Sequence, residues 1–354
     1  MLAGRTALVT GAGGSIGTEL CRQICTHGAT ALVLVDHSEF NLYQVEADLR
    51  RSHPEVRLTP VLDNLQEAER LHGLLAAHRP DTVFHAAAYK HVPMVEANPY
   101  LGVMNNIGGF ANLLHACDAV GTPRLVMIST DKAVRPTNVM GATKRACELL
   151  LQNRPMRRTH CAAVRFGNVL GSSGSVVPLF LDQIERGGPV TVTHPDITRY
   201  FMLIPEAVSL VLASGAMAEH GEIFILDMGE PVRIGDMARQ LIYLSGRNES
   251  EVAITYCGLR PGEKLYEELL LGDSERGTAI DGITVARATQ VPWAQLQHQI
   301  EALLAACHDG ERVAFARHLK AIVPEWVPSE HFAVAFSGEI KVPTQANFPA
   351  VAVG

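Results

Sequence analysis

The stretch TALVTGAGGSIG, residues 6–17, decides the fold. It opens with a short apolar run typical of a buried strand and continues into Gly11, Gly14 and Gly17, a G-x-x-G-x-x-G spacing. Directly after the turn, residues 15–28 carry apolar side chains at helical intervals and end in a glycine. A strand, a glycine-rich turn and a helix in succession predict a loop whose backbone N–H groups can hold a phosphate at the helix N-terminus.

The following segments repeat this alternation of strand and helix. A second apolar strand is expected over residues 29–36. Further apolar strands are expected at RLTPVL, TVFHAAA and RLVMIST, with helices near residues 66–78, 99–120 and 141–151. Apolar strands that alternate with amphipathic helices indicate a parallel sheet covered on both faces, the doubly wound α/β arrangement.

Acidic residues at strand ends complete the phosphate-loop pattern. Asp36 ends the second strand, where its carboxylate can accept hydrogen bonds from the ribose hydroxyls of an adenosine. The same charge would repel a 2′-phosphate, so the pattern favours NAD over NADP. Asp63, after the third strand, is expected near the adenine or else as the cap of the next helix. The sequence therefore predicts an NAD-binding Rossmann domain over residues 1–165.

Beyond about residue 165 the regularity weakens and glycine and proline become frequent. This pattern predicts a smaller α/β substrate-binding lobe, mainly residues 166–328, interleaved with later segments that return to the sheet. Residues 329–354 have no clear period, and we expect a loose tail or a segment that lies over a neighbouring subunit.

Composition and charge exclude several classes of function. The 354-residue chain has a net charge of −7 and no long basic run, which argues against nucleic-acid binding. No apolar run is long enough to cross a bilayer and no cleavable leader is visible, so we expect a cytoplasmic protein without a membrane segment in this chain. The seven cysteines include no C-x-x-C pair, so no metal site is predicted, and Cys21 and Cys25 are expected to pack as small apolar groups.

The stretch STDKAVRPTNVMGATK, residues 129–144, carries the candidate chemistry. Its closing MGATK has the spacing of the Tyr-x-x-x-Lys pair of short-chain dehydrogenases, yet Met140 stands in place of the tyrosine and cannot exchange a proton. Asp131 and Lys132 supply an acid and a base at the end of a strand, where a parallel sheet opens into its ligand cleft. Taken alone, such an Asp-Lys neighbour pair is more often a surface ion pair, and a methionine is more often a core residue.

Five long motifs resemble those of one enzyme family. They are AAAYKHVPMVEANP, STDKAVRPTNVMGATKR, RFGNVLGSSGSVVPLF, ITRYFMLIPEA and LRPGEKLYEEL. With the glycine spacing and HAAA at residues 85–88, they are similar to the extended short-chain dehydrogenase/reductase superfamily and, within it, to the UDP-N-acetylglucosamine 4,6-dehydratases of bacterial polysaccharide biosynthesis. Larger members of that family carry the methionine, N-terminal membrane helices and a further domain, so this chain is expected to be a short form or a soluble fragment.

The resemblance implies an NAD-dependent lyase that retains the configuration at carbon 5 of the sugar. Oxidation at carbon 4 acidifies the carbon-5 proton, the carbon-6 hydroxyl leaves as water, and hydride returns to carbon 6. In the family's roles Asp131 protonates the leaving hydroxyl and Lys132 removes the carbon-5 proton. These roles call for an Asp kept protonated by apolar contact and a Lys kept neutral by burial and nearby cations. Thr130 would contact the carbon-4 oxygen, whose proton leaves through Thr130, Asp131 or a water.

The resemblance also assigns binding residues. Lys144 is expected on the nicotinamide ribose, beside the inert Met140. Further cofactor contacts are expected from Gly11, Gly14, Ser15, Ile16, Gly17, Asp36, Asp63, Ala86, Ala87 and Asn106. On the UDP-N-acetylglucosamine side, the expected contacts are Arg199, Arg260 and Asn168 with the diphosphate, Glu263 with the uridine ribose and Lys90 with the sugar region.

Three other functions stay open: a dehydratase that inverts carbon 5, a nucleotide-sugar 4-epimerase and a non-catalytic NAD-binding module. Met140 counts against the first, because the inverting relatives keep the tyrosine. The Thr-Asp-Lys sequence counts against the second, because an epimerase has no use for an acid at carbon 6. By analogy with relatives, helices near residues 105–120 and 141–151 are expected to pair copies into a homo-oligomer.

Overall fold

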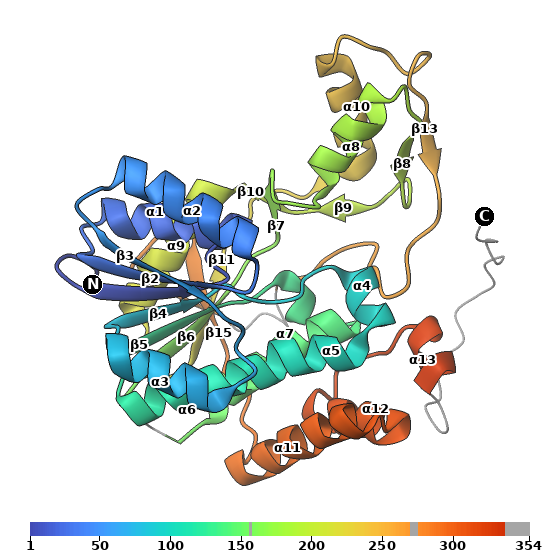
Figure 1. The fold of residues 1–354 in the computed structure, drawn as a ribbon. Coiled ribbons are helices and arrows are strands. Elements are labelled where there is room, and N and C mark those ends of the chain that lie inside the picture. Colours follow the sequence, from blue (N-terminus) through green and yellow to red (C-terminus); the bar gives the residue numbers. More distant parts are fainter. Residues whose placement is uncertain (156–157, 270–274, 337–354) are drawn as a thin grey trace.

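A nine-stranded sheet forms the centre of the part of the chain that this computed structural model describes, namely residues 1–155, 158–269 and 275–336 (Figure 1). The strand order is β14-β15-β11-β6-β5-β4-β1-β2-β3, with parallel pairing from β3 across to β11 and antiparallel pairing at β15 and β14. These strands are β1 (Thr6–Thr10), β2 (Ala31–Asp36), β3 (Arg57–Leu62), β4 (Thr82–His85), β5 (Arg124–Ile128), β6 (His160–Arg165), β11 (Glu222–Leu226), β14 (Glu275–Gly277) and β15 (Ile283–Ala286). The order reverses between β1 and β4, which confirms the predicted doubly wound sheet.

Helices cover both faces of this sheet, because successive side chains of a strand point to opposite sides. One face carries α1 (Ser15–Thr26), α2 (Glu39–Ser52) and α9 (Ile204–Met217). The other carries α3 (Ala68–His78), α6 (Gly109–Val120) and α7 (Val139–Asn153). Along β1, Val9 joins the core on the first face and Leu8 the core on the second. Cys21 and Cys25 of α1 lie buried in the first core, as predicted.

Two helical segments differ from expectation. The sequence pattern does not predict α2, because its composition is largely polar and only Leu42, Val45 and Leu49 form a buried face. Ser38 starts this helix by accepting a hydrogen bond from a backbone N–H of the first turn. The helix expected over residues 99–120 is interrupted by a wider turn and consists of α5 (Pro99–Val103), the π-helical turn η1 (Met104–Gly108) and α6.

A smaller lobe lies beyond one end of the sheet (Figure 1). It has its own core, in which Phe180, Ile184, Val190 and Ile242 are buried. Its elements are β7 (Asn168–Leu170), α8 (Val176–Glu185), β8 (Val190–Val192), β9 (Thr198–Arg199), β10 (Phe201–Leu203), β12 (Val232–Arg233), α10 (Ile234–Leu244) and β13 (Ile254–Tyr256). Its strands form the pairs β7–β10, β8–β13 and β9–β12, while β11 and β15 return to the main sheet.

The C-terminal helices pack on the sheet-bearing body, although the sequence pattern assigns residues 166–328 mainly to the smaller lobe. Helix α11 (Trp293–Asp309) lies against α5 and α7, and α12 (Arg312–Ile322) lies against α11. Both helices bury apolar side chains, Leu303 and Leu319 among them, in the core that α7 also enters. Burial on that face therefore places this segment with the body.

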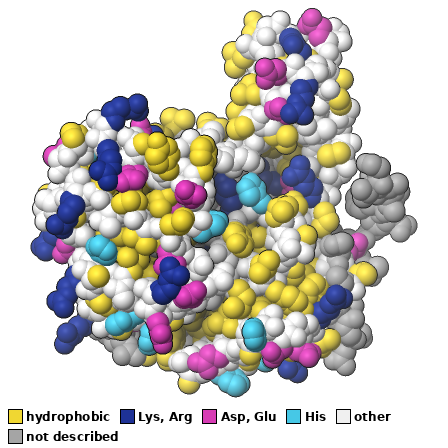
Figure 2. Space-filling model, viewed as in Figure 1, with side chains coloured by type: hydrophobic (Ala, Val, Ile, Leu, Met, Phe, Trp, Pro, Cys, Tyr) yellow, Lys and Arg dark blue, Asp and Glu magenta, His cyan; other side chains and the backbone are white. Residues whose placement is uncertain are grey.

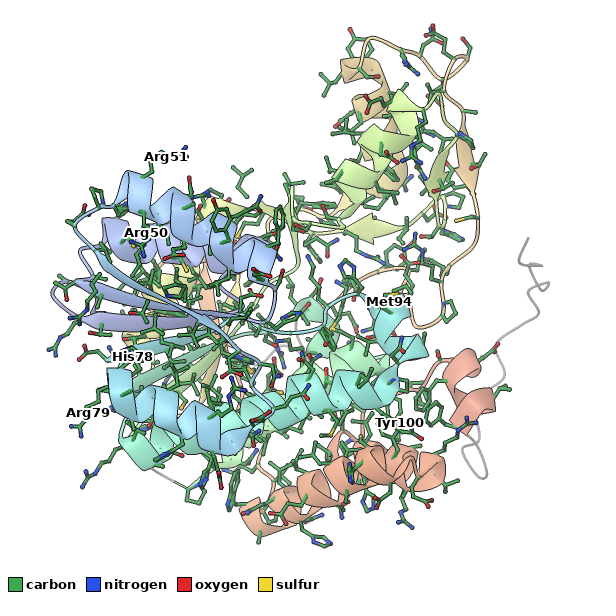
Figure 3. All side chains as sticks on the ribbon, in the orientation of Figure 1. Arg50, Arg51, His78, Arg79, Met94 and Tyr100 are labelled. Atoms are coloured by element: carbon green, nitrogen blue, oxygen red, sulfur yellow. The ribbon has the colours of Figure 1, made fainter. Side chains whose placement is uncertain are left out.

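The predicted loose tail begins with a packed helix, α13 (Glu330–Phe336). The rings of Phe332 and Phe336 pack on Phe315 of α12. Tyr100 of α5, which is labelled in Figure 3, contacts Phe315 and Phe336. Stacked aromatic rings supply the burial that so short a helix lacks on its own. The remainder of the predicted tail, residues 337–354, lies outside the described residues.

Cationic side chains gather in a hollow between the body and the smaller lobe, where Figure 2 shows Lys, Arg and His side chains close together. No helix among the described residues is long and apolar enough to span a membrane. Within the same ranges, no group of His, Cys, Asp or Glu side chains is arranged to hold a metal ion.

Candidate active site

The turn between β1 and α1 is packed so tightly that Gly11 and Gly17 have no room for a side chain. Gly11 has a positive φ of 67°, and a Cβ atom there would lie 2.7 Å from the backbone nitrogen of Ala87. A Cβ on Gly17 would lie 1.9 Å from the carbonyl oxygen of Gly11. The loop after β4, with Ala86 and Ala87, therefore touches the glycine loop, and the predicted glycines and alanines come together as expected for one binding surface.

Asp36 holds the shape of the glycine loop. Its buried carboxylate accepts a hydrogen bond of 2.9 Å from the Gly13 N–H and another of 2.9 Å from the Ser38 N–H. Each carboxylate oxygen has a second lone pair, so the group can still accept from a ligand hydroxyl. Asp63, one strand further along the sheet edge, pairs with Arg70 at 3.1 Å.

Ser15 and Ile16 begin helix α1 on different faces. The Ser15 hydroxyl accepts a 3.1 Å hydrogen bond from the Ser173 N–H, so the glycine loop contacts the loop that follows β7. Ile16 is half-buried and packs against the core on the α1 face. Gly14, which precedes them, is exposed at the N-terminal end of the helix.

Asn106 lies on the π-helical turn and supports the loop after β4. Its amide oxygen accepts from the Tyr89 N–H at 2.8 Å, and its amide nitrogen donates to the Tyr89 carbonyl at 3.0 Å and to the Thr143 hydroxyl at 2.9 Å. Asn105 donates to the same amide oxygen at 3.0 Å. The buried amide thus has its hydrogen-bonding capacity in use. Although the resemblance assigns Asn106 to the cofactor, here it joins the loop after β4 to helix α7.

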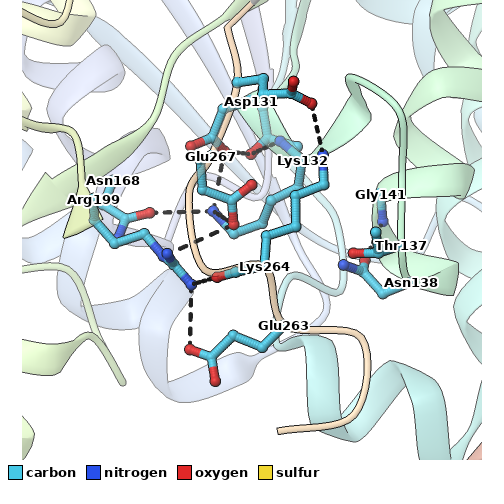
Figure 4. A network of polar contacts seen from close by, with 12 residues as sticks. Asp131, Lys132, Thr137, Asn138, Gly141, Asn168, Arg199, Glu263, Lys264 and Glu267 are labelled. Atoms are coloured by element: carbon cyan, nitrogen blue, oxygen red, sulfur yellow. Dashed lines mark hydrogen bonds and ion pairs between the residues drawn. The ribbon is translucent and has the colours of Figure 1, made fainter. Parts of the chain in front are cut away.

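The end of β5 carries the central polar cluster (Figure 4). Residues 131–133 form a 3₁₀ turn, η2 (Asp131–Ala133), which starts at Thr130. Thr130 donates a 2.8 Å hydrogen bond to Oδ1 of Asp131, and Nζ of Lys132 donates to the same oxygen at 3.0 Å. The other carboxylate oxygen of Asp131 is buried without a hydrogen-bond partner in the described structure. Unpartnered buried oxygens are rare and mark a position that a proton or a ligand hydroxyl can fill.

The expected neutral state of Lys132 is wrong. Burial disfavours the charged form of Lys132, but the carboxylates of Asp131 and Glu267 outweigh that effect and raise its pKa. Lys132 is therefore an ammonium ion at neutral pH, whereas the sequence reasoning expects a neutral amine. Asp131 is fully buried, and a hydroxyl and an ammonium group both donate to its Oδ1.

Met140 and Lys144 lie on α7 below the polar cluster. Met140 is only 3% exposed and belongs to the core on that face, so it is inert in proton transfer. Gly141, beside it, lets the helix approach closely, because a Cβ there would lie 2.1 Å from the Lys132 carbonyl oxygen. Lys144 donates a 3.0 Å hydrogen bond to the carbonyl of Ile128, the last residue of β5. Burial lowers the pKa of Lys144.

The smaller lobe contributes Asn168 and Arg199 to the same cluster. Asn168 of β7 accepts from Nζ of Lys132 at 3.2 Å. Arg199 of β9 is buried, donates to three backbone carbonyls and lies 3.3 Å from a carboxylate oxygen of Glu263. Most donors of this guanidinium are thus already occupied within the protein.

The other predicted substrate residues differ in how they are placed. Glu263 accepts from the Arg260 backbone N–H at 3.1 Å and from the Thr193 hydroxyl at 3.3 Å, so it shapes its own loop. The side chain of Arg260 is exposed, and no ion pair joins it to the described residues. Lys90, on the loop after β4, is also exposed. The structure therefore brings Asn168, Arg199 and Glu263 to the cluster, whereas Arg260 and Lys90 are exposed.

Sequence reasoning missed two carboxylates. Glu267, in the quoted motif LRPGEKLYEEL, lies 3.8 Å from Nζ of Lys132 and 3.8 Å from Nε of Arg199. Glu148 is fully buried beneath the turn and accepts a 2.7 Å hydrogen bond from the Ser129 hydroxyl. The signal for Glu148 is a charged residue directly before the apolar run Leu149–Leu151 of a helix. Glu267 lies in a loop rich in charged residues and has no such local signal.

Comparison with known proteins gives the family. Residues 7–288 match the family described as polysaccharide biosynthesis protein. The capsular polysaccharide biosynthesis protein CapD of Staphylococcus aureus is 51% identical over 272 residues, which are 76% of this chain and 45% of CapD. The probable polysaccharide biosynthesis protein EpsC of Bacillus subtilis is 48% identical over 301 residues, 84% of this chain and 50% of EpsC. The chain thus spans about half the length of these curated relatives.

A solved structure agrees in fold. Pen from Bacillus thuringiensis superposes with a TM-score of 0.73 at 28% identity, over 81% of this chain and 93% of Pen. The architecture is that of the extended short-chain dehydrogenase/reductase enzymes, as the sequence motifs predict. The family match runs from the glycine loop to the end of β15 and includes every motif that forms the polar cluster. The chain belongs to the polysaccharide biosynthesis protein family.

Proposed function

We propose that this chain is an NAD-dependent UDP-N-acetylglucosamine 4,6-dehydratase that retains the configuration at carbon 5. The observation that carries the proposal is the hydrogen-bonded chain from Thr130 to Asp131 to Lys132 at the end of β5. It puts a hydroxyl, a carboxylate and an amine in contact with one another where parallel sheets bind ligands. Elimination of water from a sugar needs all three kinds of group, whereas binding alone needs none of them.

The body has the features that a dinucleotide requires. Because Gly11 and Gly17 carry no side chains, the backbone at the start of α1 stays accessible to a diphosphate. The buried carboxylate of Asp36 is fixed beside this turn by its hydrogen bond from the Gly13 N–H. We therefore assign NAD to residues 1–165, with Lys144 at the nicotinamide ribose. When bound, NAD would take hydride from carbon 4 of the sugar and return it to carbon 6.

The protein groups can complete a balanced proton cycle once Lys132 has lost its proton. Thr130 accepts the proton of the carbon-4 hydroxyl and passes its own to Oδ1 of Asp131, along their 2.8 Å hydrogen bond. The amine of Lys132 then takes the carbon-5 proton, and Asp131 gives its proton to the carbon-6 hydroxyl, which leaves as water. Finally Lys132 returns a proton to carbon 5. Both side chains are then back in their starting states, so no external acid or base is consumed.

We assign the nucleotide-sugar to the side of the cluster formed by the smaller lobe. The exposed Arg260 and Lys90 can offer free cationic groups to the diphosphate and the sugar region. Arg199 has fewer free donors, so its contribution is the positive potential behind Asn168. The buried position of Met140 supports a route for protons that avoids that residue.

A substrate with deuterium at carbon 4 tests this function. The expected product has lost one water and carries the deuterium at carbon 6, as read by mass spectrometry and NMR, and its carbon-5 configuration is that of the substrate. Deuterium that returns to carbon 4 of an intact sugar would establish an epimerase instead. Unchanged substrate despite bound NAD would leave only a binding module. Asp131→Asn serves as the matched control, since it keeps the shape but removes the acid.

A further inference from the structure

Glu267 is a carboxylate of the polar cluster to which none of the proposed proton steps assigns a role. Its side chain is 3% exposed and comes from the segment after β13, far in sequence from the strand end that carries Lys132. Figure 4 shows it between Lys132 and Arg199. One of its oxygens lies 3.8 Å from each of these cations, and the other is buried with no hydrogen-bond partner among the described residues.

The polar and charged groups around Lys132 come from the turn η2, from the strands β7 and β9, and from the loop that carries Glu267. Asp131 on η2 lies 3.0 Å from Nζ and Glu267 lies 3.8 Å from it, while Asn168 on β7 accepts from it at 3.2 Å. Arg199 on β9 opposes the lysine charge, and Lys264 lies in the same loop as Glu267. An opposite charge within about 4–6 Å favours the ionised form of a lysine by about one to three pH units. Removal of either carboxylate therefore favours the neutral amine.

We propose that Glu267 is a positioning residue that holds Lys132 as an ammonium ion and so sets the pH at which this lysine becomes a base. The inference rests on the proposed function in one respect, namely that Lys132 must be neutral to remove the carbon-5 proton. The placement of the two groups does not depend on it. Burial raises the pKa of Glu267 itself, with the nearby Asp131 carboxylate adding to the effect and the surrounding cations opposing it.

Glu263 provides the matched control. It lies in the same loop and also contacts Arg199, at 3.3 Å. Its other partners are the Arg260 N–H and the Thr193 hydroxyl, and it forms no ion pair with Lys132. Replacement of either glutamate removes one negative charge from the loop, but only Glu267 lies against the lysine. A general effect of lost charge or of loop disturbance would thus affect both variants alike.

Trace labelling of Lys132 measures its charge without any turnover. The full chain is exposed to a small amount of acetic anhydride across a pH series, and acetylation of the Lys132 peptide is read by mass spectrometry against a reference peptide. Only a neutral amine reacts, so the midpoint of the curve reports the pKa of the lysine. Glu267→Gln should move this midpoint down by about one pH unit or more. Glu263→Gln should leave it in place, and Glu267→Asp, which keeps the charge, should restore most of the wild-type value.

The pH dependence of kcat/KM supplies the second readout. Activity should rise with pH as Lys132 loses its proton, and in Glu267→Gln this rise should occur at lower pH by the same shift. If wild-type protein makes the dehydrated sugar but neither the labelling midpoint nor the pH profile moves in Glu267→Gln, the role of Glu267 is refuted. If the labelling midpoint moves but no sugar is ever dehydrated, the control of Lys132 stands and the proposed function fails.

Discussion

At the residue scale, the charge of Lys132 depends on the groups around it. The lysine lies between the carboxylates of Asp131 and Glu267, which keep it charged in spite of its burial. A base of this kind is available only after it has released a proton, so the pH of the medium controls its activity. The same carboxylate of Asp131 accepts a hydrogen bond from the Thr130 hydroxyl. In the proposed function this contact gives the carbon-4 proton a path that avoids the position of the usual phenol.

Met140 tests whether that path is sufficient. Met140→Tyr places a larger, hydroxyl-bearing ring where the side chain is 3% exposed within the core. Overpacking of this kind lowers the free energy of unfolding by about 1–3 kcal/mol. We expect no gain in turnover, because in the proposed mechanism Thr130 and Asp131 already transfer the proton. Urea unfolding and steady-state rates check both points.

Met140→Leu is the control for that substitution. It conserves volume and should cost less than about 1.5 kcal/mol while turnover stays near that of the wild type. A tyrosine variant that turns over several times faster than the leucine variant would contradict the assigned route of the carbon-4 proton.

At the scale of elements, the sequence predicts the glycine turn between β1 and α1, but it does not predict the contacts that hold this turn in place. The spacing of Gly11, Gly14 and Gly17 after an apolar strand is a local signal, and the structure forms the expected strand, turn and helix. Asp36 is likewise local, since it ends the next strand. Contacts such as that of Gly11 with the loop after β4 depend on which strands become neighbours.

The parts that sequence reasoning missed depend on tertiary burial. Helix α2 buries only three apolar side chains, too few for the sequence pattern to predict a helix. Helix α13 is stabilised by the packing of its two phenylalanines on Phe315 of α12. Glu267 was hidden for a similar reason, since only the fold brings it to Lys132. The prediction of a neutral Lys132 was wrong because it took nearby cations into account but not the carboxylate of Glu267, which raises the pKa of the lysine.

The turn between β1 and α1 can be tested by filling its space. Gly17→Ala puts a methyl group 1.9 Å from the Gly11 carbonyl oxygen, so the backbone must shift. We expect the free energy of unfolding to fall by about 1–3 kcal/mol and NAD binding to weaken, as measured by thermal unfolding and calorimetric titration.

Gly73→Ala is the matched control, because it makes the same substitution where there is room for the methyl group. Its Cβ would meet no atom within 4 Å, and it lies inside helix α3. An alanine there should stabilise the helix by about 0.5–1 kcal/mol and leave NAD binding unchanged. Equal NAD affinity in the two variants would show that the close approach at Gly17 does not matter for the ligand.

At the scale of the whole molecule, a buried ionic network connects the site to the C-terminal part of the body. Glu148 of α7 accepts hydrogen bonds from Arg165 of β6 at 2.5 and 2.7 Å and pairs with Arg145 at 3.2 Å. Arg145 in turn donates to Glu325 at 2.8 Å, beyond α12. Because Glu148 also accepts from Ser129, which lies close to the turn η2, packing of the C-terminal segment supports the geometry of the candidate site.

Removal of one charge from this network should lower the free energy of unfolding substantially. Glu148→Gln leaves two buried guanidinium groups with less compensation, so the free energy of unfolding at neutral pH should fall by about 3–5 kcal/mol. Asp182→Asn removes an exposed partner of Arg186 and should cost less than about 1 kcal/mol. Chemical unfolding measures both, and similar costs would refute the role given to the buried network.

The same network predicts a direction of pH dependence. Burial alone would raise the pKa of Glu148, but the Arg165 and Arg145 guanidinium groups outweigh it and lower that pKa. The unfolded chain therefore takes up this proton first as the pH falls. The stabilisation is complete above the unfolded pKa and is lost as the pH drops through the folded value. Unfolding free energies across the acid range should decline less steeply in Glu148→Gln than in the wild type.

The most direct measurement concerns the proton at carbon 5. Wild-type protein and Lys132→Ala are incubated with NAD and UDP-N-acetylglucosamine in deuterated water, and the sugar is read by NMR. The account predicts deuterium at carbon 5 of a dehydrated sugar with the wild type, and neither deuterium nor loss of water with the variant, while calorimetry finds NAD binding intact in both. Exchange at carbon 5 by Lys132→Ala at a rate near that of the wild type would contradict it.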